Sequence, residues 1–86
     1  LKESEELDAQ RDQVRRTMRE IEKMLPAVED AIERNDLGTE ALDKAHAAVD
    51  RARESLDSSD VRDLTRSSES LERTLSVFQN IVDRAP

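Results

Sequence analysis

The chain has 86 residues, of which 41% are charged and 35% hydrophobic, with a single Phe and no Trp, Tyr or Cys. Sheets bury aromatic and β-branched side chains, so this composition argues against a sandwich or barrel and predicts an all-α domain. A chain this small buries only about 60% of the surface exposed by its unfolded form, which leaves room for one thin core and no enclosed active site. The lack of Cys excludes disulfides and thiolate zinc sites, and we expect a reducing, cytoplasmic location.

The 14 Lys and Arg residues are outnumbered by 21 Asp and Glu residues, which gives a formal net charge of −7. Phosphate backbones are held by clustered cations, but here Asp12 and Glu20 interrupt the densest basic run, which consists of Arg11, Arg15, Arg16 and Arg19. This run is typical of a solvated helix face, so we expect no nucleic-acid partner. No apolar stretch approaches the roughly 18 residues that would span a bilayer, so we expect no membrane partner either.

The first segment carries six apolar residues at the spacing 4, 3, 4, 3, 4, which places them on one stripe of a helix: Val14, Met18, Ile21, Leu25, Val28 and Ile32. Leu7 extends this stripe backward, but Arg11 stands where a further apolar residue would be expected. We therefore predict a helix over about residues 4–35 whose first turns are less firmly docked than the rest.

Two residues mark irregular points of this first helix. Pro26 lacks a backbone donor and clashes with the carbonyl four residues earlier, so we expect a bend there. Because the apolar stripe keeps its register across Pro26, we expect no break. The helix should end within residues 35–38, where Gly38, the only Gly, is expected to supply the permissive backbone of helix termination.

Two further helices are predicted, over about residues 40–57 and 60–84. Thr39 is expected to cap the first of them, whose stripe is Leu42, Ala45, Val49, Ala52 and Leu56. The stripe of the last helix is interrupted only by a Ser and consists of Val61, Leu64, Ser68, Leu71, Leu75, Phe78 and Val82. The short polar connection at residues 57–60 favours an antiparallel hairpin of these two helices.

The sequence therefore predicts one domain over residues 1–86, an antiparallel three-helix bundle in which a long first helix, bent near Pro26, is followed by a helical hairpin. Pairs of an acid and a base four residues apart should add about 0.2–0.5 kcal/mol each: Asp12 with Arg16, Asp30 with Arg34, Glu40 with Lys44, and Glu69 with Arg73. Because Leu1 rather than Met begins the sequence, we expect a fragment of a longer chain.

Candidate catalytic and metal-binding groups are few. The single His, His46, has Asp43 and Asp50 nearby on its helix, but one His without Cys provides too few ligands for zinc. Residues 57–60 lack the spacing, Gly and distal Glu of a calcium loop, so helix capping explains them better. Adjacent carboxylates such as Glu5 and Glu6, or Glu29 and Asp30, point about 100° apart on a helix and cannot act as an acid and base couple. We therefore predict no enzymatic activity and no catalytic, cofactor-binding or metal-binding residues in this chain.

Four stretches carry a resemblance through their order and spacing. Residues 11–13 read Arg-Asp-Gln, residues 22–25 read Glu-Lys-Met-Leu, and residues 56–64 read Leu-Asp-Ser-Ser-Asp-Val-Arg-Asp-Leu. They are similar to the Arg-Asn-Gln, the Glu-Lys-Phe-Leu and the Leu-x-x-x-Asp-x-x-x-Ile hairpin of the C-terminal helical lid of the 70-kDa heat-shock chaperones, the DnaK family. Residues 39–56 match the penultimate lid helix in length and in their Ala-rich face.

The resemblance covers about residues 9–84, and the chain departs from the family in two respects, the length of one stretch and the expected absence of the earlier part of the long helix. Between Leu25 and Thr39 the chain is about six residues longer than the family pattern, close to two helical turns, and this stretch includes Pro26. The family's substrate-latching positions lie mostly earlier in the long helix, so no latch residue is carried over.

The resemblance implies a lid that closes over bound peptide and slows its release. The parent chain would contain an ATPase domain, hence ATP as its cofactor, and a β-sandwich that binds unfolded client polypeptides. Its partners would be that sandwich, the clients and co-chaperones. The alternative is a structural or scaffolding bundle, such as a spectrin-like repeat or a coiled-coil adaptor, although spectrin-type repeats usually carry a core Trp. We also expect Met24, Phe78 and Ile81 to be at risk of exposure, so that the isolated fragment self-associates or swaps helices.

Overall fold

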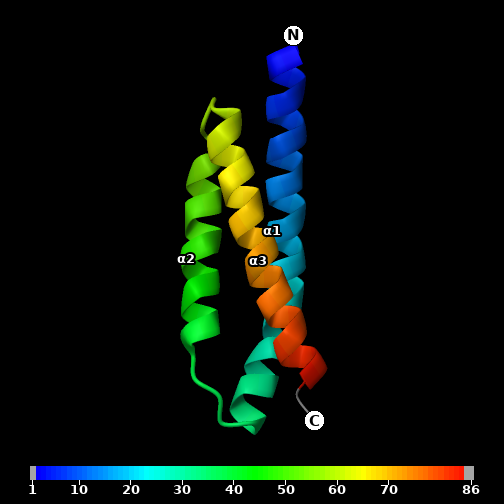
Figure 1. The fold of residues 1–86 in the computed structure, drawn as a ribbon, viewed down its shortest axis with the longest axis vertical. Helices are drawn as coiled ribbons and strands as arrows, with labels where there is room; N and C mark the ends of the chain where they lie inside the picture. The colour runs from blue at the N-terminus through cyan, green and yellow to red at the C-terminus, as the bar shows by residue number, and fades with distance from the viewer. Residues whose placement is uncertain (1, 85–86) are drawn as a thin grey trace.

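A computed structural model describes residues 2–84, which form three α-helices: α1 (Lys2–Arg34), α2 (Glu40–Ser55) and α3 (Val61–Arg84). Successive helices run in opposite directions along a bundle whose principal extents are 50 × 18 × 15 Å (Figure 1). The predicted all-α, three-helix antiparallel architecture is confirmed. The ends expected at residues 35 and 57 instead fall at residues 34 and 55.

The helix α3 is the centre of the bundle, because it packs along both α1 and α2, whereas α1 and α2 contact each other only over a small region. Fully buried side chains recur every seven residues on both α1 and α3: Val14, Ile21 and Val28 on α1, and Leu64, Leu71 and Phe78 on α3. Seven residues are close to two helical turns, so each row follows one face of its helix. These two rows form the main core.

The buried face of α2 differs from the predicted stripe. Its buried residues are Ala45, Ala48, Ala52 and Ser55, whereas Leu42, Val49 and Leu56 are only half-buried. Small side chains allow two helices to approach closely, so the small face of α2 lies against α3 and the larger apolar side chains cover the margins. Ala45 and Ala52 of the predicted stripe are therefore at the centre of this contact, and its larger residues are at the margins.

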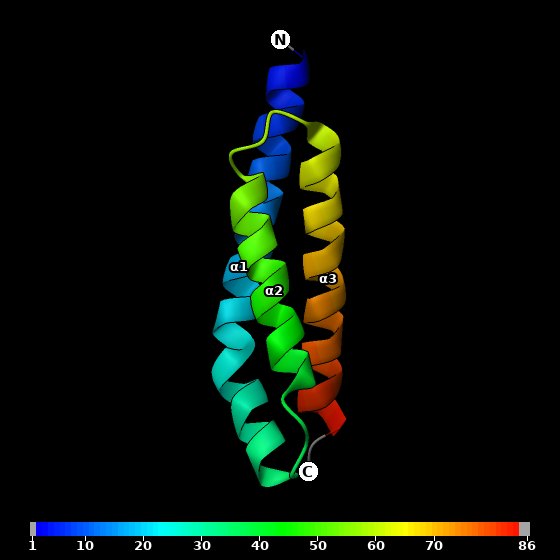
Figure 2. The same ribbon diagram turned by 90° about the vertical axis from the view of Figure 1, so that its left-hand side faces the viewer.

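Pro26 lies inside α1 without breaking it. The helix curves along its length, and its last turns lean toward the foot of α2 (Figures 1 and 2). Pro26 cannot donate a hydrogen bond to the carbonyl of Glu22, which allows the two flanking turns to tilt apart.

The end of α1 is formed by Asp36 and not by Gly38. Asp36 has a φ of 51°, in the left-handed region, and Gly38 has no positive φ. The amides of Asp36 and Leu37 donate to the carbonyls of Glu33 and Ile32 at 3.4 and 3.0 Å, the two bonds of a Schellman motif. The prediction that Gly38 terminates the helix is wrong, because the backbone reverses two residues earlier, where an Asp tolerates the left-handed conformation.

The start of α2 also differs from the prediction. Thr39 stands at the N-cap position but its side chain makes no capping hydrogen bond. Its φ of −89° and ψ of 8° lie outside the extended region in which a cap side chain normally reaches back to the helix amides.

Of the four predicted ion pairs, one is present: Asp30 and Arg34, at 3.0 Å. Asp12 pairs with Arg15 instead of Arg16, at 3.3 Å. Within residues 2–84, Glu40 and Glu69 form no ion pair with Lys44 and Arg73. All of these side chains are on the surface, where competing partners and water make such pairs weak and interchangeable.

The predicted exposure of apolar side chains is corrected in part. Phe78 is fully buried, and Met24 and Ile81 are half-buried and pack against the core. Among the described residues, the large apolar side chains that are exposed are those of Leu37 and Val77, at 46% and 47%. None of the described helices has the length and apolar character needed to cross a membrane.

Candidate functional site

The most elaborate polar contact between distant parts of the chain joins α1 to the α2–α3 loop. The Nε of Arg11 donates to the carbonyl oxygen of Leu56 at 3.1 Å, and its Nη2 donates to the carbonyl oxygen of Ser58 at 2.9 Å. Asp8, one turn earlier on α1, lies 3.7 Å from the same guanidinium. The Arg11 side chain is only 25% exposed, so both hydrogen bonds are partly shielded from water.

The two acceptors explain why an Arg suits this position. Leu56 is the C-cap of α2, and carbonyls at a helix C-terminus lack helical partners and carry partial negative charge. A guanidinium presents several donors in a rigid fork, so one side chain reaches two such carbonyls at once.

No side chain among residues 4–13 is buried, as expected for weakly docked first turns of α1, but Arg11 adds a contact that was not predicted. The sequence indicated a weakly docked start of α1, because Arg11 interrupts the apolar stripe. In the structure the interruption is a polar bridge, which we call the Arg11 tie: the hydrogen bonds from Arg11 to the carbonyls of Leu56 and Ser58. It links residues more than forty positions apart in the sequence, and it fixes the first half of α1 to the hairpin.

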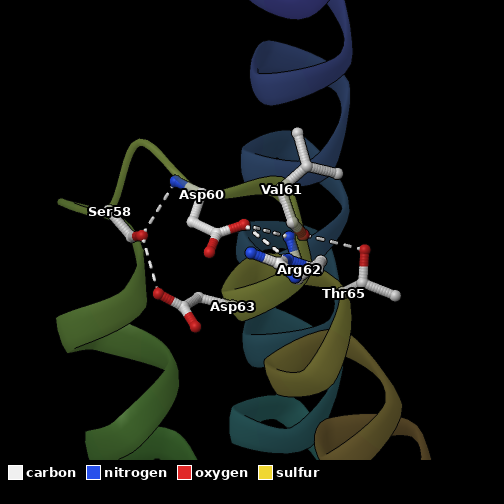
Figure 3. Close-up of polar contacts among 6 residues, drawn as sticks. All are labelled: Ser58, Asp60, Val61, Arg62, Asp63 and Thr65. Atoms are coloured by element: carbon white, nitrogen blue, oxygen red, sulfur yellow. Dashed lines mark hydrogen bonds and ion pairs between the residues drawn. The ribbon is translucent and has the colours of Figure 1, made fainter.

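The α2–α3 loop is held by a second network of its own (Figure 3). Asp60 Oδ1 accepts hydrogen bonds from the backbone amide of Arg62 at 2.9 Å and from Arg62 Nε at 3.4 Å. The Ser58 hydroxyl accepts from the amide of Asp60 and donates to Asp63 Oδ2, both at 3.0 Å. The loop thus caps the start of α3, which confirms the capping role predicted for residues 57–60.

Asp60 has a lowered pKa as a result. The hydrogen bond from the Arg62 amide is the main cause, followed by the hydrogen bond from the Arg62 side chain, since both favour the ionised carboxylate. The side chain therefore keeps its charge to a lower pH than a free Asp does.

The other candidate residues do not converge. His46, Glu5, Glu6, Glu29 and Asp30 are all exposed. Asp50, which was considered as a partner of His46, lies 3.9 Å from Arg53. Among residues 2–84 there is no group of three or more His, Asp or Glu side chains placed to hold a metal ion.

The partners of Arg11 were not predicted from the sequence, although one signal was available. A single Arg at an otherwise apolar position, in a helix that faces a polar loop, is a candidate for bonding that loop. Without the pairing of helices, however, the sequence does not say which loop lies opposite residue 11.

No protein-family model matches this chain, and no curated protein or solved structure matches it either. Any functional argument therefore depends on the residues of the chain and on the geometry described above.

Proposed function

We propose that this chain acts as the C-terminal lid of a 70-kDa heat-shock-type chaperone, closing over the peptide-binding domain of its parent protein and slowing the release of unfolded polypeptide. The observation that carries the proposal is the Arg11 tie. It joins two of the stretches on which the resemblance to the DnaK family rests, residues 11–13 and residues 56–64, through hydrogen bonds of 3.1 and 2.9 Å. Motifs that contact each other form one structural unit, which supports a common origin for both.

The geometry suits a lid that moves as one body. The helix α1 has 33 residues, a length of about 50 Å, and its first turns extend beyond the loop of the hairpin (Figure 2). Along the rest of its length α1 is packed against α3, and at residue 11 it is tied to the loop. In the proposed function the hairpin is a brace that keeps α1 straight enough for docking to be all or none.

In this proposal the other parts of the chemistry lie in the parent protein. ATP would bind to its ATPase domain and detach the lid, and client polypeptides would bind to its β-sandwich. Co-chaperones would act on those domains. The residues described here would make the lid rigid and would not contact ATP.

The experiment that tests the proposal deletes residues 1–86 from the parent protein and follows the dissociation of a fluorescent peptide after dilution. We expect faster release with basal ATP hydrolysis largely unchanged. The variant Arg11→Ala should fall between the intact and the deleted proteins, and the matched variant Arg15→Ala, on an exposed position of the same helix, should release peptide at the normal rate. An unchanged release rate after the deletion would refute the lid.

A second candidate is a structural or scaffolding bundle. The observation that favours it is the pair of buried rows with a seven-residue spacing on α1 and α3, because such rows also characterise coiled-coil adaptors. Unchanged peptide release, together with a second copy of the bundle elsewhere in the parent protein, would favour this alternative over the lid.

A further inference from the structure

The helix α2 is packed differently from the other two helices. It packs along α3 but contacts α1 only over a small region, whereas α1 and α3 share the main core. Figure 2 shows α2 in front of the other two helices, joined to α1 by a turn at its foot and to α3 by a loop at its top. The bundle therefore consists of a closely packed pair, α1 and α3, and a third helix that rests mainly on α3.

Polar bonds between α2 and the rest of the bundle are concentrated at one end. Both hydrogen bonds of the Arg11 tie go to carbonyls at or just beyond the C-terminus of α2, those of Leu56 and Ser58. Within residues 2–84, no side-chain hydrogen bond or ion pair joins residues 40–55 to α1 or α3, because the side-chain bonds of these residues stay within α2. Polar bonds thus fix the C-terminal end of α2 and leave its N-terminal end without such an attachment.

The N-terminal end of α2 also lacks a cap. Thr39 makes no side-chain hydrogen bond to the first turn of the helix. A Cβ at Gly38 would meet nothing within 4 Å, so the turn that leads into α2 is not packed against the bundle at that point. Because the first amides of a helix have no partners within the helix, an end without a cap unfolds at a lower cost than a capped one.

The contact of α2 with α3 buries few large side chains from α2. Within α2 the buried residues are Ala45, Ala48, Ala52 and Ser55, and the larger Leu42 and Val49 are half-buried. The free energy gained by burial is roughly proportional to the apolar area removed from water. The contact therefore stabilises the fold less than the rows of large side chains that α1 and α3 bury.

The facing surface of α3 is partly polar. Ser67, Ser70 and Thr74 line two open cavities, of about 570 and 390 Å³, together with the small residues of α2. The contact is thus not filled along its whole length. The hydroxyl groups of these residues can bond to water when α2 leaves, so exposing them costs less than exposing an apolar row.

We propose that the N-terminal part of α2, residues 40–50, is a releasable strap. In the open state the strap unfolds and leaves α3, while α1 and α3 stay packed and the Arg11 tie holds the far end of α2. The segment between the end of α1 and the last turn of α2 then forms a loop attached at both ends. Opening exposes the half-buried Ser70 and Thr74 on α3. This inference does not depend on the lid proposal, because it concerns only contacts within the bundle.

The open state keeps the main core. The fully buried rows, which include Val14 and Ile21 on α1 and Leu71 and Phe78 on α3, belong to the two helices that remain paired. Opening of the strap is therefore a partial unfolding that requires less free energy than unfolding of the whole chain.

The first test is amide hydrogen exchange of the ¹⁵N-labelled chain, followed by NMR in low concentrations of urea. We expect amides of residues 44–50 to be protected at least about tenfold less than those of residues 16–30 and 66–80. Their exchange should also depend less on urea, because the slope scales with the surface that an opening exposes.

The second test uses a variant of the α1–α3 core. Val14→Ala removes buried methyl groups from α1 and should speed the exchange of the α1 and α3 amides at least about tenfold. Residues 44–50 should stay within about twofold, because the closed and open states both contain this contact and lose it equally. If Val14→Ala leaves too little folded chain, Ile21→Val makes the same comparison with a change of about threefold to tenfold.

The matched variant lies in the strap itself. Ala47 is exposed, so Ala47→Gly weakens the helix without removing a packed side chain. We expect residues 44–50 to exchange about fourfold faster. The α1 and α3 amides should change by the same factor, since the closed state is destabilised relative to both the open and the unfolded state.

Three results would overturn the proposal. The first is equal protection and equal urea dependence of all three helices, which would mean that the bundle opens as one unit. The second is acceleration of residues 44–50 by the core variant to the same extent as α1 and α3. The third is weaker protection of residues 52–58 than of residues 44–50, which would place the opening at the end held by the Arg11 tie.

Discussion

The two connections of the bundle are held in different ways. The turn between α1 and α2 is closed mainly by backbone hydrogen bonds, with Asp36 in the left-handed conformation and no side-chain cap from Thr39. Its one side-chain hydrogen bond is local, from Asn35 Nδ2 to the carbonyl of Ala31 at 2.8 Å. The loop between α2 and α3 is held by side chains, with Asp60 capping α3 and Arg11 bonding two loop carbonyls from α1. Each connection is only a few residues long, so length does not account for the difference.

The difference shows what each connection does for the fold. The turn after α1 reverses the chain and leaves Leu37 exposed, and its one side-chain hydrogen bond, from Asn35, stays within the end of α1. The loop after α2 is where the hairpin meets the long helix, and its side chains determine whether the two move together. We therefore expect substitutions to have unequal effects on the two connections.

The largest expected effect is that of Arg11→Ala. The substitution removes two hydrogen bonds from a charged donor and leaves the carbonyls of Leu56 and Ser58 without that partner, so we expect the free energy of unfolding to fall by about 2 kcal/mol. Urea unfolding followed by circular dichroism measures the change. Arg11→Lys should recover only part of the loss, because an ammonium lacks the fork of donors. Arg15→Ala, at an exposed position, is the control. If it lowers the free energy of unfolding as much as Arg11→Ala does, the Arg11 tie contributes nothing beyond an ordinary surface arginine.

Next in size is the loss of the cap at Asp60. The variant Asp60→Ala removes the acceptor of the Arg62 amide and should lower the thermal midpoint, whereas Thr39→Ala should leave it unchanged, because Thr39 makes no capping bond. Asp60→Asn keeps an acceptor oxygen and should lie between Asp60→Ala and the unchanged chain. Equal effects of Asp60→Ala and Thr39→Ala would contradict the contrast between the two connections.

A smaller effect of the opposite sign is expected in the turn after α1. Asp36→Gly should stabilise the chain by about 0.5–1 kcal/mol, because Gly adopts the left-handed conformation without the steric cost of a Cβ. Gly38→Ala should stabilise by about 0.4–1 kcal/mol, since Gly38 has no positive φ and a Cβ there meets nothing within 4 Å. The same unfolding assay checks both, and destabilisation by Gly38→Ala would show that the turn requires a Gly after all.

The smallest expected effect is a pH dependence that comes from Asp60. Its folded pKa lies below its ordinary value of 3.8, so its contribution to stability is complete above that value and is lost as the pH falls through the lower folded pKa. Thermal unfolding of the original chain and of Asp60→Asn between about pH 2 and pH 6 should show this loss in the original chain alone. Parallel curves for the two proteins would assign the acid sensitivity to other carboxylates.

The helices and the main core could be predicted from the sequence, because the 3,4 spacing of the apolar stripes that include Val14, Ile21, Val28, Leu71 and Phe78 indicates a buried helical face. The face of α2 could be predicted only in part, through its alanines at 45 and 52, since the burial of the other small residues depends on how closely α3 approaches. The partners of Arg11 could not be predicted either. The pattern of residues along one helix does not show which loop of the chain lies opposite that helix.

The positions of the helix ends could be predicted approximately, but the residues and hydrogen bonds that form each end could not. Residues 35–38 and 57–60 consist mostly of residue types that are common in turns, and they mark both connections correctly. Which residue takes the left-handed conformation is decided within the turn, and the backbone reversed at Asp36 before Gly38 was reached. Capping was predicted for residues 57–60 as a group, and in the structure Asp60 accepts the hydrogen bond from the Arg62 amide. Thr39 occupies the same position at the start of α2 with dihedral angles that prevent such a bond.

The measurement that tests the central claim most directly is amide hydrogen exchange of the chain with and without Arg11→Ala. If Arg11 ties the first half of α1 to the hairpin, the two parts unfold together. We then expect amides in residues 5–20 to exchange at least about tenfold faster in Arg11→Ala, while amides of α1 beyond residue 21 and of α3 change much less. Equal exchange of residues 5–20 in the two proteins would contradict it.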